Sequence, residues 1–129
     1  MEKQTVKLKI TTISTGNPVN VIKGTGYFRE KDGRILITHT DNKNVKTAFM
    51  ITNDRITLSR SAELYSLKVP VKSGEALLGI MGEENTFSVI GKTAEYERFK
   101  TGGKIFLEYT LPDLSDISMD FKVEAEFSF

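Results

Sequence analysis

Polar and apolar residues alternate along most of the chain with a period of two, which predicts β-strands. In the clearest run, residues 118–129, apolar side chains occupy every second position: Met119, Phe121, Val123, Ala125, Phe127 and Phe129. An alternation of this length is typical of an antiparallel strand with one face in the core and one in water. Shorter runs of the same kind predict strands at 6–13, 19–30, 34–40, 45–52, 55–61, 64–71, 86–94 and 104–111.

The segment 24–41 predicts a long β-hairpin centred on Asp32 and Gly33. An Asp-Gly pair suits a two-residue type I′ turn, because both central residues of that turn need positive φ. The turn fixes the register of the two strands. The predicted inward-facing pairs are Phe28 with Ile37, Gly26 with His39, and Gly24 with Asp41.

Two glycines on one face of this hairpin, Gly24 and Gly26, leave a gap opposite His39 and Asp41. Glycine inside a strand marks a bend, a bulge or a close approach by another group. One interpretation is the corner of a closed sheet, where glycine permits curvature. The other is a small pocket floored by glycine and walled by His39 and Asp41.

An arginine is predicted on an apolar face. A polar turn at 53–54 makes residues 45–52 and 55–61 a second hairpin, which sets Arg60 opposite Thr47 and in line with Leu58. Burying a guanidinium is costly unless a carboxylate or carbonyl groups satisfy it. Asp41, on the neighbouring hairpin, is one candidate partner. Alternatively, Arg60 lies at the rim of the sheet and reaches water with its long side chain.

The segment 73–84 is ambiguous, because three glycines interrupt its apolar residues. Each glycine weakens a helix by about 1 kcal/mol, so a bulged strand, a helical turn and an apolar flap containing Leu77 and Leu78 all stay open. The remaining segments show no helical periodicity, which excludes βαβ folds. Short strands joined by tight turns predict an all-β chain, with a single antiparallel up-and-down barrel of about eight to ten strands over residues 1–129.

Several segments, in order, carry a likeness to a known family: Gly26-Tyr27-Phe28, Asp41, Val45-Lys46-Thr47, Arg60-Ser61, and Gly103-Lys104-Ile105 leading to Tyr109. By these segments the chain resembles the YwiB-like proteins, small bacterial proteins of uncharacterised function with a calycin-like (lipocalin-type) β-barrel. It departs from their pattern at 69–86 and at His39, where an aromatic residue is expected. The resemblance implies the fold, and the wider calycin group binds small, often apolar molecules inside the barrel.

The amino-acid composition limits the classes of partner and of binding site that we expect for this protein. The chain has 129 residues, enough for one domain, and 18 basic and 17 acidic residues give a net charge of +1. This balance predicts no nucleic-acid or anionic-membrane partner. The chain has no cysteine, which excludes disulfides and thiolate metal sites. Without a signal-like start or an apolar run of about 20 residues, we expect a cytoplasmic protein.

The sequence gives little support for a catalytic site or a metal site. One histidine and no cysteine argue against zinc, and we expect neither metal nor cofactor. His39 and Asp41 share a face and would serve a hydrolase as base and orienting acid, but no nucleophile stands out. A lone strand histidine is more simply structural. We therefore expect a protein that is not an enzyme.

Two functions stay open. The first is a noncatalytic barrel that binds a small, partly apolar or acidic ligand. Its candidate binding residues are Arg60, His39, Asp41, Thr47, Tyr109 and Tyr27. The second is a filled barrel that acts in protein–protein interaction, as a homodimer or with a partner. The phenylalanines serve either case, lining a cavity in the first and filling the core in the second.

Overall fold

The computed structural model describes residues 3–53, 55–62, 65–71, 74–80, 83–111 and 119–129, without the side chains of 65, 74–80, 83–85 and 87. Within these ranges the chain forms ten strands. They are β1 (Gln4–Ser14), β2 (Asn20–Lys31), β3 (Arg34–Thr40), β4 (Lys46–Ile51), β5 (Ile56–Ser61), β6 (Tyr65–Val71), β7 (Gly74–Ile80), β8 (Glu83–Phe99), β9 (Gly102–Leu111) and β10 (Met119–Ser128).

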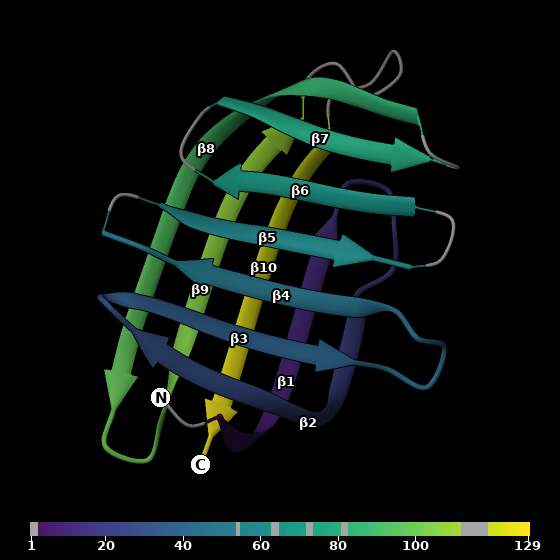
Figure 1. Ribbon diagram of the computed structural model, residues 1–129. Helices are drawn as coiled ribbons and strands as arrows, with labels where there is room; N and C mark the ends of the chain where they lie inside the picture. The colour runs from purple at the N-terminus through teal and green to yellow at the C-terminus, as the bar shows by residue number, and fades with distance from the viewer. Residues whose placement is uncertain (1–2, 54, 63–64, 72–73, 81–82, 112–118) are drawn as a thin grey trace.

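The strands form one closed antiparallel barrel. Each strand pairs with its neighbour in sequence, and β1 pairs with β10 to close the sheet. Figure 1 shows a flattened barrel in which β3–β6 cross the front while β1, β9 and β10 run steeply behind them. The long strands β2 and β8 bend from one layer into the other. The predicted all-β, up-and-down barrel is confirmed.

The Asp32–Gly33 turn sets the register as predicted. Asp32 has a φ of 54° and Gly33 a φ of 76°, and Gly26 pairs with His39. The predicted pairing of Gly24 with Asp41 is wrong, because the pairs between β2 and β3 stop at Gly26 and His39, and Gly24 keeps only its partner on β1, Leu8. Strand β2 has turned away from β3 at this point, and β3 ends at Thr40.

Three layers of inward-facing residues cross the front strands β3 to β6. We call the first the polar layer: His39, Thr47, Arg60 and Leu67. The middle layer follows: Ile37, Phe49, Leu58 and Val69. The aliphatic layer lies at the other end: Ile35, Ile51, Ile56 and Val71. Three members of the middle layer have no exposed surface, so side chains fill the centre of the barrel.

The rear strands supply the opposite wall of the core. Val123, Ala125 and Phe127 are buried, as the alternation in β10 predicts. Phe129 is 46% exposed, because β10 ends one residue before it. Its ring meets those of Phe28 and Phe127 edge-on, at centroid distances of 5.2 and 5.9 Å. Phe129 therefore covers one edge of the core instead of filling it.

The described part of the ambiguous segment 73–84 is strand, while residues 73 and 81–82 lie outside the described residues. Residues 74–80 form β7, which pairs on one side with β6 and on the other with β8. A backbone hydrogen-bonded on both sides excludes the helical turn and the flap. Strand β8 is 17 residues long and has an irregularity between Gly91 and Thr93. The extra residue there reverses the alternation, so Tyr96 pairs with the inward residue Ile105.

Candidate ligand-binding site

Three predicted site residues are direct neighbours in the polar layer. His39 of β3 pairs with Thr47 of β4, which pairs with Arg60 of β5. The two short turns joining these strands fix that register, and the period of two turns all three side chains inward. His39 and Thr47 are buried, and Arg60 is partly exposed. The predicted pairing of Thr47 with Arg60 is therefore correct.

Arg60 lacks a complete set of partners. Its Nε atom is buried and makes no hydrogen bond. Asp41, which the sequence suggests as a partner, lies in the turn after β3 and accepts hydrogen bonds from the backbone N–H groups of Lys43 (2.8 Å) and Val45 (2.9 Å). The Val45 bond is the main cause that lowers the pKa of Asp41, and the charges of His39 and Arg60 lower it further. The positive charge of Arg60 therefore acts on Asp41, but the carboxylate of Asp41 accepts its hydrogen bonds from the backbone of its own turn.

The histidine has a defined tautomer. Nδ1 of His39 lies 3.0 Å from the carbonyl oxygen of Thr25. A carbonyl only accepts, so Nδ1 carries the hydrogen and Nε2 is the acceptor of the neutral ring. The imidazole lies over Gly24, where an added Cβ would come within 2.6 Å of Cε1. The predicted glycine-floored pocket is therefore absent at Gly24, because the histidine ring itself occupies that space.

Tyr109 comes to the polar layer from the rear wall. It is buried on β9, and its ring stacks on that of Phe121 at 5.0 Å. Burial raises its pKa to about 12, against an opposing effect from the positive charge of Arg60. Tyr109 and Arg60 therefore lie near each other, and the phenol stays neutral at physiological pH.

Tyr27 does not join this group. Its side chain is 44% exposed on the outer face of β2, where Nζ of Lys3 lies 4.5 Å from the ring centroid. Neighbouring residues in a strand face opposite sides, so a side chain next to the inward Gly26 must point out. The structure thus gathers four of the six predicted residues and puts Asp41 at the rim and Tyr27 outside.

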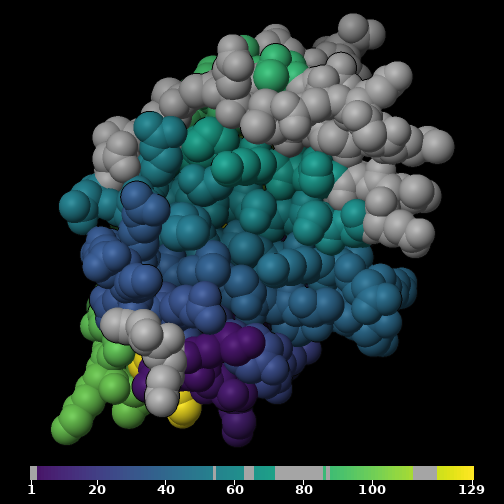
Figure 2. All heavy atoms as spheres, viewed as in Figure 1, coloured from purple at the N-terminus to yellow at the C-terminus, as the bar shows by residue number. Residues whose placement is uncertain are grey.

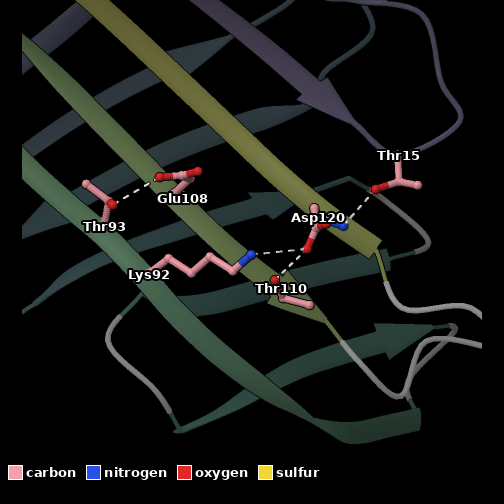
Figure 3. Close-up of polar contacts among 6 residues, drawn as sticks. All are labelled: Thr15, Lys92, Thr93, Glu108, Thr110 and Asp120. Atoms are coloured by element: carbon pink, nitrogen blue, oxygen red, sulfur yellow. Dashed lines mark hydrogen bonds and ion pairs between the residues drawn. The ribbon is translucent and has the colours of Figure 1, made fainter.

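A second polar group, not predicted, lies across β8, β9 and β10 (Figure 3). Asp120 accepts a hydrogen bond from Thr110 Oγ1 at 2.6 Å, and Lys92 Nζ lies 3.6 Å from the same carboxylate. Both contacts lower the pKa of Asp120, and Thr110 contributes most. The backbone N–H of Asp120 donates to the Thr15 hydroxyl at 3.0 Å. Each of these polar contacts joins two residues of the group. The group therefore holds the start of β10 against β8, β9 and the turn that follows β1.

Two hollows formed by described residues lie away from the polar layer. One, of about 540 Å³, is lined by the aliphatic-layer residues Ile35, Ile51, Ile56 and Val71, with Tyr96 and Ala94 of β8. Another, of about 630 Å³, lies over the strand pairs around Lys9, Lys104 and Ser128. Neither is lined by His39, Thr47, Arg60 or Tyr109. The outward side chains of β3 to β6 occupy the middle of the face in Figure 2.

Two further kinds of feature bear on function: clusters of metal-binding side chains and helices long enough to span a membrane. Within the described ranges, no three or more His, Asp or Glu residues gather so as to hold a metal ion. Over the same ranges, the structure has no helix of the length and apolarity that a membrane crossing requires.

Comparison with known proteins supports the fold. Neither a protein-family model nor a curated protein sequence matches the chain. Among solved structures, the crystal structure of the ywiB protein from Bacillus subtilis matches with a TM-score of 0.78 and 14% sequence identity. The match covers 98% of this chain and 92% of that chain. The chain has a YwiB-like fold, as the resemblance predicted. At this identity the likeness shows the fold alone, and the narrower likeness to calycins stays a prediction.

Proposed function

We propose that this protein is a noncatalytic barrel that binds a small, partly apolar molecule through an acidic group at the polar layer. The observation that carries the proposal is Arg60, whose inward side chain holds a buried Nε atom without a partner. A buried donor without a partner is costly, and a guanidinium is the side chain best suited to bind a carboxylate or phosphate. An anionic ligand would supply the hydrogen-bond acceptor that Arg60 lacks within the protein.

The neighbours of Arg60 suit an acceptor-rich ligand. Thr47 lies directly opposite, and its hydroxyl can donate. Tyr109 keeps its proton up to a pKa of about 12, so its phenol can donate as well. Leu67 flanks Arg60 on β6 and gives an apolar group a surface to pack on. Together they offer donors to an acid and an apolar contact to the rest of the molecule.

The geometry of His39 favours binding over catalysis. A histidine acting as general base in a His–Asp pair has its Nδ1–H oriented by the carboxylate. Here Nδ1 of His39 donates to the Thr25 carbonyl, while Asp41 accepts from its own turn. This histidine is therefore held as a structural and ligand-contacting residue.

Native mass spectrometry tests the proposal. Protein purified from cells is measured intact and after denaturation, alongside the variants Arg60→Met and Arg29→Met. Arg29 is an exposed arginine on β2 and serves as the matched control. We expect a small acidic molecule on the wild type and on Arg29→Met, and none on Arg60→Met. Wild-type protein without any bound molecule, or Arg60→Met protein that keeps it, would overturn the proposal.

The second function, protein–protein interaction, draws on a separate observation. Ile13, Val19 and Val21 are each about half exposed (46%, 57% and 47%) around the turn between β1 and β2. Such an apolar group on the outer face is typical of a surface covered by another copy or a partner. Sedimentation velocity of the wild type and of Val21→Lys tests it. A dimer that Val21→Lys dissociates would support the second function, and a wild-type monomer at high concentration would exclude the homodimer.

A further inference from the structure

A surface hollow lies at the aliphatic layer of the barrel. Four inward side chains of that layer line a hollow of about 540 Å³: Ile35, Ile51, Ile56 and Val71. All four are buried. A volume between about 300 and 1,000 Å³ is typical of small-molecule sites. Polar residues complete the lining, among them the cations Arg55 and Lys92, and the described lining residues include no aspartate or glutamate.

Tyr96 adds a phenol to the lining of the hollow. It lines the hollow, and its hydroxyl oxygen is buried without a hydrogen-bond partner. The ring is held in place because it stacks on Phe127, with a centroid distance of 6.4 Å and an angle of 7°. A rigid phenol without a partner is a poor feature of a filled core. It is well suited to donate a hydrogen bond to a molecule that enters the hollow.

The irregularity in β8 shapes the opposite wall. Between Gly91 and Thr93 the strand holds one residue more than β9 opposite it. As a result, Ala94 and Tyr96 pair with inward-facing residues of β9. Ala94 is small and exposed, and it lines the hollow. Strand β8 therefore contributes a small residue and a phenol at the place where the front and rear layers meet.

From these observations we propose that the hollow at the aliphatic layer is a second ligand site, which takes a hydrocarbon-rich small molecule with one hydrogen-bond acceptor that reaches Tyr96. The apolar body of the molecule packs on the aliphatic layer, and its carbonyl or ether oxygen accepts a hydrogen bond from Tyr96. This site is separate from the one at Arg60, because the fully buried residues Ile37, Phe49 and Val69 lie between them.

A neutral fluorescent probe with a carbonyl group tests the site. The chain has no tryptophan, so Asn53→Trp, at an exposed position lining the hollow, introduces one reporter. The probe is 6-propionyl-2-dimethylaminonaphthalene. We expect energy transfer from the introduced indole to the bound probe. Glu124→Trp, on the outer face of β10, should show much weaker transfer. Equal transfer from both positions, or none, would overturn the proposal.

Two variants separate the hollow from other apolar surfaces. Ala94→Phe fills the hollow from its exposed side, and Ala48→Phe makes the same change on the outer face of β4, opposite Ser59. We expect Ala94→Phe to abolish probe binding and Ala48→Phe to leave it intact, with circular dichroism confirming that both are folded. Arg60→Met should also bind as the wild type does. Loss of binding in Arg60→Met, or full binding in Ala94→Phe, would contradict a separate site.

Tyr96→Phe tests the hydroxyl itself and keeps the proposal testable if Ala94→Phe does not fold. It should weaken the carbonyl probe about tenfold, as loss of one buried hydrogen bond predicts. It should leave N-phenyl-1-naphthylamine, an apolar probe without a carbonyl, unchanged. Equal effects on the two probes, or none on either, would show that the hydroxyl does not bind the ligand.

Discussion

The two ends of the barrel differ in composition although the same four strands build them. At one end, β3 to β5 present a histidine, a threonine and an arginine, and β6 a leucine. At the other, all four strands present isoleucine or valine. Yet each end holds one buried polar atom without a partner, Nε of Arg60 and the hydroxyl of Tyr96. Within the described part of the chain, the packed middle holds none.

The comparison shows where a small barrel can bind ligands. Side chains can fill the interior of a small barrel, and here Ile37, Phe49 and Val69 are fully buried at its centre. Sites must then form where the layers end, and their chemistry follows from the last residues of each layer. An arginine at one end and a tyrosine among aliphatic residues at the other favour different ligands.

The largest effect is expected in the middle layer, which separates the two ends. Phe49→Ala removes a fully buried ring and should lower the free energy of unfolding by about 3–5 kcal/mol. Urea denaturation measures this. Met50→Ala, next to it on the outer face of β4, should cost less than about 1 kcal/mol. Similar losses in the two variants would contradict a filled centre.

A pH dependence should distinguish the polar end. The pKa of Tyr109 is about 12 in the fold against 10 in the unfolded chain, so folding favours the protonated phenol. Its contribution is complete below pH 10 and is lost as the pH rises to 12. The loss is about 2–3 kcal/mol, at about 1.4 kcal/mol per pKa unit. The free energies of unfolding of the wild type and of Tyr109→Phe, measured between pH 9 and 11.5, check this loss. Parallel curves of free energy against pH for the two proteins would refute it.

Gly24→Ala should act on the polar end alone. The added methyl group would lie 2.6 Å from the His39 ring, which must move and give up its bond to Thr25. We expect a loss of about 1–3 kcal/mol in the free energy of unfolding. The double-mutant cycle with His39→Ala provides the control. Gly24→Ala should cost little in that background, and an unchanged loss there would assign the effect to the backbone.

The smallest effect is expected at the aliphatic end, and it has the opposite sign. Tyr96→Phe removes a buried hydroxyl without a partner, so it should stabilise the ligand-free protein by about 1 kcal/mol. Thermal unfolding measures the shift, with Tyr27→Phe as the exposed control. A lower melting temperature for Tyr96→Phe would mean that the hydroxyl is satisfied in solution.

The sequence predicts the front of the barrel well, because its turns are short. The Asp32–Gly33 turn and the turn at 53–54 determine the pairs from Gly26–His39 to Thr47–Arg60, and the structure has both sets of pairs. A register fixed at a tight turn extends along the whole hairpin. The pairing of Thr47 with Arg60 therefore follows from the amino-acid sequence, while the pairing of His39 with Thr47, which joins the two hairpins, comes from the structure.

Other parts do not follow from the sequence, for physical reasons that differ from place to place. Extending the hairpin assigns Asp41 to a strand, but β2 bends toward β1 and leaves β3 to end before it. The alternation does not reveal Tyr96, because an irregularity shifts the register of β8. A signal for it exists, since an unbroken alternation from Val89 would turn Glu95 and Glu97 inward. The approach of residues across the barrel, such as Tyr109 toward the charge of Arg60, depends on how strongly the sheet curls.

The seam between β1 and β10 has a consequence for how the protein is made. The other strand pairs join neighbours in sequence and can form in turn as the chain emerges from the ribosome, at about 5–20 residues per second. The seam joins Lys7 to Ser128, so it must wait until β10 has been synthesised. Until that moment the nascent sheet presents open edges to other nascent chains. The newly made protein passes from an open, aggregation-prone sheet to an edge-free barrel in one late step.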